Sequence, residues 1–187
     1  MKLYKVKDLM VPLSEYAIVS EDATLFEAVV ALEQAQEEFD PKRYRHRAVL
    51  VHKKGAAEKI VGKLSMFDLM RGLEPRYREI GNDRMIARAG FSPAFLKAMQ
   101  DQHALWEEPL KDICRKAAGL RVENIMHSID EGEFVMEDTT LDEAIHRLVT
   151  CHHQSLLVIN TRRDIVGILR TTDVFTKICE AIKACEL

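Results

Sequence analysis

The sequence predicts a mixed α/β (α+β) fold in which two copies of one β-α-β-β-α unit pack pseudo-symmetrically. The main reason is an internal repeat, because Val6–Met10 returns as Val122–Met126, 116 positions later. At the same offset, Val19–Ala28 returns as Val135–Ala144. A duplication of this length indicates two copies of one supersecondary unit, which usually pack against each other. The groove between the copies is therefore the first place to expect a functional site.

The first helix of each copy begins at a recognisable cap. Thr24 and Glu27 have the three-residue spacing of a capping box, and so do Thr140 and Glu143. In such a box the hydroxyl accepts from the amide three residues later, and the carboxylate accepts from the threonine amide. Apolar residues then recur with helical spacing in both copies, so we expect each helix to bury one face.

Two short apolar runs follow each helix and predict a hairpin of buried strands. They are Ala48–Val51 and Ile60–Leu64 in the first copy, and Leu156–Ile159 and Ile165–Leu169 in the second. Runs this rich in β-branched residues and leucine are typical of strands buried on most of their surface, and the polar links between them are turn signals. The unit is completed by an extended segment before the first helix and a second helix after the hairpin: 17–19 and 65 onward in the first copy, 134–136 and 171 onward in the second.

The repeat divides the chain into two repeats, at 1–73 and 120–187, and an unrepeated segment at 74–119. Within that segment, Ser92–Pro93 is a good helix start, and a second helix is expected from Pro109 to Gly119. Long stretches without secondary structure are unusual in compact domains. The sequence therefore predicts a helical insertion between the repeats.

The composition limits the classes of function. The 187 residues carry a net charge of -3, which gives no electrostatic reason to expect nucleic acid or an anionic membrane as a partner. No apolar run reaches the length of a signal-peptide core or a membrane span, so we expect a cytoplasmic protein. The four cysteines form no Cys-x-x-Cys pair and are expected to be reduced. Cys151–His153 is more simply an exposed helix end than a metal site, so no metal is predicted.

Taken together, the repeated motifs resemble a known family. Leu9–Met10 and Ile125–Met126 in the lead-ins, an Asp-x-Thr-Leu-x-Glu-Ala helix start, and an Ile-Val-Gly strand followed by an aspartate occur twice in the same order. In this order they resemble the CBS (cystathionine β-synthase) domain, and the pair resembles a Bateman module, over about residues 3–73 and 120–180. The resemblance implies a regulatory module that binds an adenosine ligand (AMP, ADP, ATP or S-adenosylmethionine), forms a homodimer and acts on a partner protein in trans.

The segment Gly62–Asp68 follows a strand and opens a helix, an arrangement that suits a nucleotide. Ser65 offers a hydroxyl beside the free amides of the helix start, where a phosphate is favourable. Asp68 lies one turn further on, where its carboxylate could accept from the hydroxyls of a ribose. The resemblance implies these same roles for the Ser-x-x-Asp element. Alternatively, both residues only cap the helix.

The second copy departs from this pattern. Arg170 stands where the first copy has Ser65, and Thr171 and Thr172 follow it before Asp173. Asp173 could still hold a ribose while Arg170 reaches a phosphate. Alternatively, Arg170 fills the pocket and pairs with Asp173. The sequence leaves open whether the module has one functional site or two.

The resemblance also implies that a base would be held by the lead-in, the first strand and the start of the hairpin. An apolar slot with backbone donors and acceptors suits a purine. The positions are Met10, Ala17, Ile18, Arg47 and Ala48 in the first copy, and Met126, Phe134, Ser155 and Leu156 in the second. Most of these would also be ordinary core or strand positions.

Between its first helix and its hairpin, the first copy is eight residues longer than the second by alignment of the apolar runs. The longer stretch contains Asp40–Arg47, with four cations, a tyrosine and a histidine. It could contact a polyphosphate. The commoner role of such a charged run is a solvated loop or a protein-binding surface.

We therefore weigh three functions. The first is a nucleotide-sensing regulatory module. The second is a ligand-free scaffold for dimerisation or partner binding, which Arg170 and the insertion would favour. The third is an enzyme, and the sequence argues against it because no nucleophile–base pair, zinc motif or Walker-type phosphate loop is evident.

Overall fold

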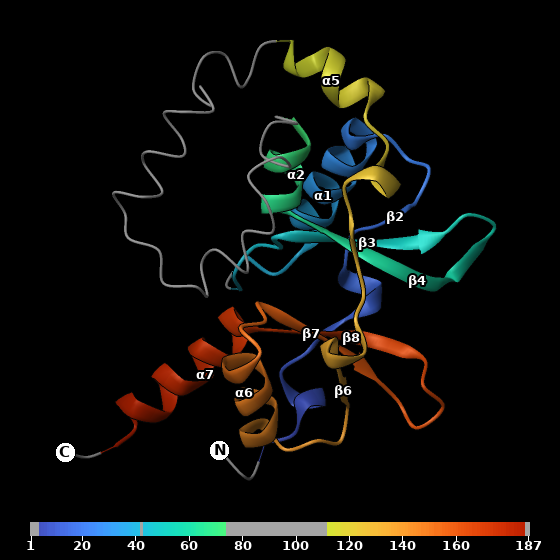
Figure 1. The fold of residues 1–187 in the computed structure, drawn as a ribbon. Helices are drawn as coiled ribbons and strands as arrows, with labels where there is room; N and C mark the ends of the chain where they lie inside the picture. Colours follow the sequence, from blue (N-terminus) through green and yellow to red (C-terminus); the bar gives the residue numbers. More distant parts are fainter. Residues whose placement is uncertain (1–3, 42, 74–111, 186–187) are drawn as a thin grey trace, which may run out of the picture.

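The computed structural model describes residues 4–41, 43–73 and 112–185. Two four-stranded sheets lie face to face at the centre, and helices cover the outer face of each (Figure 1). Each sheet combines a parallel pair with an antiparallel hairpin, as the predicted β-α-β-β-α unit requires. The predicted mixed α/β fold and its two repeats are confirmed.

The first repeat supplies the upper sheet and its helices in Figure 1, and the second supplies the lower. The elements of the first are β2 (Ile18–Ser20), α1 (Leu25–Glu38), β3 (Ala48–Lys53), β4 (Ala56–Ser65) and α2 (Met66–Leu73). Those of the second are β6 (Phe134–Met136), α6 (Leu141–Thr150), β7 (Ser155–Ile159), β8 (Ile165–Arg170) and α7 (Thr171–Lys183).

The lead-in of each repeat completes the sheet of the other. Strand β1 (Val11–Pro12) pairs with β8, and β5 (His127–Ser128) pairs with β4. Val6 is fully buried in the outer core of the second repeat, and Val122 is fully buried in that of the first. Each repeat therefore needs the chain of the other to close both its sheet and its core.

The glycines of the two Ile-Val-Gly strands make room for these crossing lead-ins. A Cβ atom on Gly167 would lie 2.5 Å from the backbone oxygen of Val11, and one on Gly62 would lie 2.7 Å from the sulfur of Met126. Real Cβ atoms essentially never approach other atoms this closely. The motif that marks the repeat in the sequence thus has a packing reason, since a side chain there would push the neighbouring lead-in away from the sheet.

Helix starts follow the prediction in one repeat and depart from it in the other. In α1, Thr24 and Glu27 form the full capping box, with the Glu27 carboxylate 2.6 Å from the Thr24 amide. In α6, Thr140 Oγ1 accepts from the amide of Glu143 at 3.4 Å, but the Glu143 carboxylate pairs with Arg147 instead. The prediction of a second full box was therefore wrong, because a cation one turn along attracts the carboxylate more strongly than a backbone amide does.

Strand register also corrects the size of the insertion in the first repeat. Ala48 lies opposite Ser65 and Ser155 lies opposite Arg170, so the hairpins are offset by 107 positions rather than 108. The insertion is therefore nine residues long. The sequence alignment slipped by one because both β3 and β7 are continuous apolar runs without an internal marker.

Part of the segment between the repeats is described. Helix α5 (Ile113–Gly119) ends where the sequence predicts, and Ala117 packs against the core of the first repeat. The expected helix start at Ser92–Pro93, and that at Pro109, lie outside the described residues, so the division into 1–73, 74–119 and 120–187 stays a prediction. In the described part of the chain, every helix is too short or too polar to cross a bilayer.

Candidate ligand-binding site

Ser65 and Asp68 form a closed hydrogen-bonded cap at the start of α2. Asp68 Oδ2 accepts from the Ser65 amide at 2.9 Å and from the Ser65 hydroxyl at 2.6 Å, and Ser65 Oγ accepts from the Asp68 amide at 3.3 Å. Both residues are partly buried. Among the described residues, Asp68 Oδ1 takes no hydrogen bond. One carboxylate oxygen therefore remains for a ligand even while the other caps the helix.

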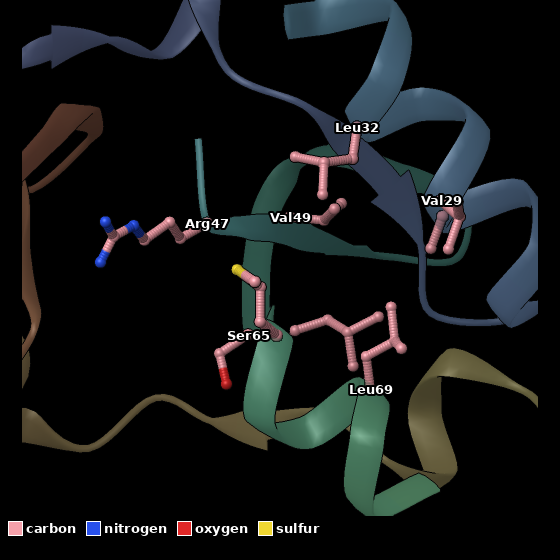
Figure 2. A pocket seen from close by; sticks show the side chains of 9 residues that line it. Val29, Leu32, Arg47, Val49, Ser65 and Leu69 are labelled. Atoms are coloured by element: carbon pink, nitrogen blue, oxygen red, sulfur yellow. The ribbon is translucent and has the colours of Figure 1, made fainter. Parts of the chain in front are cut away.

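Arg47 places a positive charge beside this cap. Its backbone oxygen accepts from the Met66 amide at 3.2 Å, which ties the start of β3 to the start of α2. The guanidinium extends away from the apolar side chains around it (Figure 2). The Arg47 side chain is exposed and has neither an ion pair nor a hydrogen bond within the described part of the chain. An unpaired arginine at a helix start is suited to binding a phosphate.

The cavity next to Ser65 and Arg47 is small. Its volume is about 20 Å³, which is room for roughly one water molecule. Small-molecule sites usually have volumes of about 300–1,000 Å³. Its wall is mostly apolar, formed by α1, β3, β4 and α2: Ala28, Val29, Leu32, Val49, Leu64, Met66 and Leu69 (Figure 2). In this structure the groove beside the cap is closed to a nucleotide.

The other residues expected around the first site are divided among different places. Ala17 and Ile18 line a separate cavity of about 380 Å³ against α1. Met10 lies against Gly167 in the second repeat, because its lead-in crosses over. Ala48 lies directly opposite Ser65 in the hairpin. The structure thus brings together Ser65, Asp68, Arg47 and Ala48, and it places Ala17 and Ile18 at the start of β2, the strand next to β3, where the Ala17 backbone oxygen accepts from the Leu50 amide. Met10 lies apart from them, against the second repeat.

At the equivalent position of the second repeat, Arg170 forms a two-bonded ion pair with Asp173. Arg170 Nε donates to Asp173 Oδ2 at 2.6 Å, and Nη2 donates to Oδ1 at 2.8 Å. Both side chains are more than nine-tenths buried. Of the two alternatives for Arg170, the structure shows the pairing with Asp173.

Three residues in and beside the insertion of the first repeat cover this ion pair, and we call Phe39, Arg43 and His46 the plug. Arg43 Nη2 lies 3.3 Å from Asp173 Oδ1, and His46 Nδ1 lies 3.3 Å from Arg170 Nη1. Both guanidinium groups lie close to the Phe39 ring, at 5.2 and 5.3 Å from its centroid. The sequence favoured a solvated loop or a protein-binding surface here over a polyphosphate contact, and Arg43 and His46 instead contact the second repeat.

Burial at the plug shifts the pKa values of His46 and of Tyr16, which packs against it. His46 is 2 % exposed, and burial together with the positive charge of Arg170 lowers its pKa to about 4. Tyr16 packs edge-on against His46, and burial raises the pKa of its hydroxyl to about 12. Both rings are therefore neutral near pH 7, which lets His46 lie next to two arginines without adding a third positive charge.

The remaining residues expected at the second site serve the fold. Thr171 Oγ1 donates to the backbone oxygen of Gln154 at 3.0 Å, and Ser155 lies opposite Arg170 in the hairpin. Leu156 is fully buried in the outer core, and Phe134 packs against the central core between the sheets. Met126 crosses to the first repeat and packs in its core.

A buried charged cluster joins the repeats near β5, and the sequence reasoning missed it. Glu133 is fully buried, with Lys63 Nζ 2.9 Å from its Oε2 and His127 Nε2 2.9 Å from its Oε1. Burial alone would raise the pKa of Glu133, but Lys63 and His127 outweigh it and hold that pKa below its usual value. The signal was present, because the repeat aligns Glu133 with the small apolar Ala17. Asp130 also approaches His127 and Glu133, within 4.8 Å, but Lys63 already supplies a cation to the buried carboxylate.

Comparisons with solved structures agree with this architecture. The CBS-pair protein CBSX2 from Arabidopsis thaliana matches with a TM-score of 0.60 at 16% identity, covering 97% of this chain and 99% of that one. A CBS domain-containing protein of unknown function from Bacillus anthracis matches with a TM-score of 0.60 at 15% identity, covering 96% and 95%. The CBS domain of a bacterial CNNM/CorC family Mg²⁺ transporter in complex with ATP matches with a TM-score of 0.59 at 17% identity, covering 95% and 89%. No curated protein matches the sequence.

The fold and the paired helix-start positions define a tandem module of two β-α-β-β-α repeats that exchange their lead-ins. The model of the CBS domain matches residues 6–75 and 122–180, which is more than half of the chain. The chain therefore belongs to the CBS domain family, and its two repeats form a CBS pair.

Proposed function

We propose that this CBS pair is a regulatory sensor of an adenosine nucleotide or related ligand, acting on a partner protein in trans. The candidate ligands are AMP, ADP, ATP and S-adenosylmethionine. The observation that carries the proposal is the cap at the start of α2, where, among the residues that the structure describes, Asp68 keeps one carboxylate oxygen without a donor and the Arg47 guanidinium has no partner. The proposal assigns no catalytic reaction to the chain.

Each residue has a distinct role in this proposal. Asp68 Oδ1 would accept from a ribose hydroxyl, and the amides at the start of α2 together with Arg47 would bind a phosphate. The base would enter beside Val29, Leu32 and Leu69, whose apolar side chains now close the cavity. Ala48 would border the ligand through its backbone, since it lies opposite Ser65.

The closed cavity fits a sensor better than a permanent cofactor site. A ligand shifts a conformational equilibrium only if it binds two states with different affinities. Because the groove holds only about 20 Å³ here, the ligand-bound state must differ from this one. That difference is what a partner protein could detect.

Known relatives of the same fold support the choice of ligand class. CBSX2 has a structure in complex with AMP, matching this chain with a TM-score of 0.54, and the CNNM/CorC transporter domain has one in complex with ATP. These ligands are properties of those proteins. For this chain they define which compounds to try first.

The test is isothermal titration of the full chain with AMP, ADP, ATP and S-adenosylmethionine. We expect at least one to bind, Arg47→Ala to weaken nucleotide binding at least tenfold, and Asp68→Asn to weaken all of them. Arg162→Ala is the matched control, because Arg162 is an exposed arginine in the β7–β8 turn, 85% exposed, and far from the cap in the fold. If none of the four ligands gives heat at high protein concentration, nucleotide sensing is refuted.

A ligand-free scaffold is the second candidate function. The observations that favour it are the small first cavity and the covered second position. It predicts that no nucleotide changes the melting temperature, and that Asp68→Asn changes only the stability of α2. Ligand-induced stabilisation that the Asp68→Asn variant lacks would exclude it.

We also propose a homodimer formed through the outer helices. Phe67 on α2 and Phe175 on α7 are both 60% exposed, and Met66, Met70 and Ile182 extend these apolar surfaces. Large exposed apolar side chains grouped on one helix are typical of interaction surfaces. Light scattering should give twice the chain mass, and a Phe67→Glu, Phe175→Glu variant should give the monomer mass.

A further inference from the structure

The second ligand position is already filled by side chains of the first repeat. His46, 2% exposed, lies with its ring centroid 4.2 Å from that of Phe39 and 4.5 Å from that of Tyr16. Phe39 and Tyr16 belong to the buried cluster between the two sheets. Phe39 and His46 of the plug therefore lie in the central core, unlike the solvated loop that the charged sequence favoured.

The plug and Arg170 also satisfy the carboxylate that would hold a ribose. Asp173 Oδ1 has Arg170 Nη2 at 2.8 Å and Arg43 Nη2 at 3.3 Å, and Oδ2 has Arg170 Nε at 2.6 Å. These N–H groups donate to the same oxygens that ribose hydroxyls would use. At the first position the matching carboxylate, that of Asp68, has one oxygen without a donor among the described residues.

We propose that the insertion of the first repeat is a built-in occupant of the second ligand position. Each chain then binds a single adenosine-type ligand, at Ser65 and Asp68, and truncating the plug together with Arg170 exposes a second site at Asp173. The inference rests on the proposed function for the class of ligand. It goes further by assigning the stoichiometry and the residues that set it.

The nine extra residues explain why only one position is filled. They lie between α1 and β3 of the first repeat, and they carry Arg43 and His46 across to β8 and α7 of the second. The second repeat lacks this insertion, so its own α6–β7 link, which carries His153, is too short to make the reciprocal crossing in the same way. His153 instead lies 3.9 Å from Glu133 within its own repeat. The asymmetry of the sequence thus becomes an asymmetry of the two ligand positions.

Native mass spectrometry and titration calorimetry with AMP and ATP test the stoichiometry. We expect one nucleotide per wild-type chain and two per chain of the Phe39→Ala, Arg43→Ala, His46→Ala, Arg170→Ser variant, which truncates all three plug residues and gives α7 a Ser-x-x-Asp start. Adding Asp68→Asn to that variant should return the count to one, now at the second position. Phe39→Leu alone is the matched control, since it keeps an apolar side chain over the ion pair and should leave the count at one.

The outcomes separate this inference from the proposed function. Two nucleotides bound to the wild-type chain would refute the proposal that the plug occupies the second position. So would an opened variant that has a native circular dichroism spectrum and binds no additional nucleotide. If the wild-type chain binds no nucleotide, nucleotide sensing is refuted. The proposal about the plug is still tested, because the opened variant should then bind one nucleotide more than the wild type.

Should the opened variant fail to fold, the wild-type protein supplies a second measurement. Nuclear Overhauser effects from the adenine protons of bound AMP should reach methyl groups beside Ser65, such as those of Val29 and Leu69. Effects to Leu157 or Ile168, which lie in the cluster with Phe39, would show a ligand at the plugged position and refute the inference.

Discussion

At the end of β4, Ser65 and Asp68 cap a helix beside the exposed Arg47, whereas at the end of β8 Arg170 and Asp173 form a two-bonded ion pair beneath the plug. The two positions occupy equivalent places in the repeat, so their surroundings can be compared residue by residue. The difference comes from one substitution, Ser65 against Arg170, and from nine additional residues in one connection. It teaches that duplication of a fold preserves the backbone of a site more readily than its chemistry.

The largest expected difference between the two positions is in stability. Arg170→Ala removes one partner of a buried ion pair and should lower the free energy of unfolding by about 3 kcal/mol, with Arg43 limiting the loss. Ser65→Ala removes only a helix cap and should lower it by about 1 kcal/mol. Urea denaturation of both variants measures the contrast. Equal losses would mean that the second position is no more structural than the first.

The pH dependence of stability should depend on the plug. Burial, followed by the charge of Arg170, lowers the pKa of His46 to about 4, below its ordinary value of 6.5. Below pH 6.5 the unfolded chain takes up a proton that the folded chain refuses, so stability falls as the pH drops from 6.5 towards 4 and then levels off for this group. The loss should be about 3 kcal/mol.

Comparison with His46→Gln isolates this dependence, and His152→Gln is the control because His152 is an exposed histidine. The first variant should lose less stability between pH 7 and pH 5 than the wild type does, and the second should lose as much. A His46→Gln variant with the wild-type pH profile would contradict the assignment of a neutral, buried imidazole.

The two crossing lead-ins offer a third comparison. A Cβ on Gly167 would meet the rigid backbone of Val11, whereas one on Gly62 would meet first the flexible end of Met126. We expect Gly167→Ala to destabilise by about 2 kcal/mol and Gly62→Ala by about 1 kcal/mol, the range for overpacking. Thermal unfolding of the two variants, side by side, measures the order. The reverse order would indicate that the second lead-in is the less adaptable of the two.

The smallest expected contrast is between the two helix caps. Thr24 takes part in both bonds of a capping box, while Thr140 makes one long bond to the Glu143 amide. Thr24→Ala should therefore lower the free energy of unfolding by about 1 kcal/mol and Thr140→Ala by about 0.5 kcal/mol. Equal losses of free energy in denaturation of the two variants would show that the two caps contribute equally to stability.

Local signals in the sequence predicted most of the secondary structure. Thr24 with the helical spacing after it, and the apolar runs around Val49 and Val158, depend only on residues within one element, so their periodicity can be read without a structure. The pairing of β1 with β8 could not be read in this way. Strands of two residues carry no periodic signal, and the partner of β1 lies more than a hundred positions away.

The candidate site was predictable at its helix starts and less so in its surroundings. Ser65, Asp68, Arg170 and Asp173 follow a spacing that the repeat itself marks. The plug was not predictable, because a run containing Arg43 and Arg45 has the composition of a solvated loop, and only tertiary contacts show which of its side chains are buried. Glu133 was missed although the repeat aligns it with the apolar Ala17, because the charge that stabilises it belongs to Lys63 in the other repeat.

The exchange of lead-ins has a consequence for how the chain folds. Val11 pairs with Ile168, and Gly62 pairs with Ser128, so both sheets are completed by residues very distant in sequence. Contacts of such high contact order slow folding, because a long loop must close before they form. When only the first repeat has emerged from the ribosome, the edge of β4 that later pairs with β5 is exposed. We therefore expect that the nascent chain cannot complete its native fold until β8 has been synthesised, because β1 pairs with that strand.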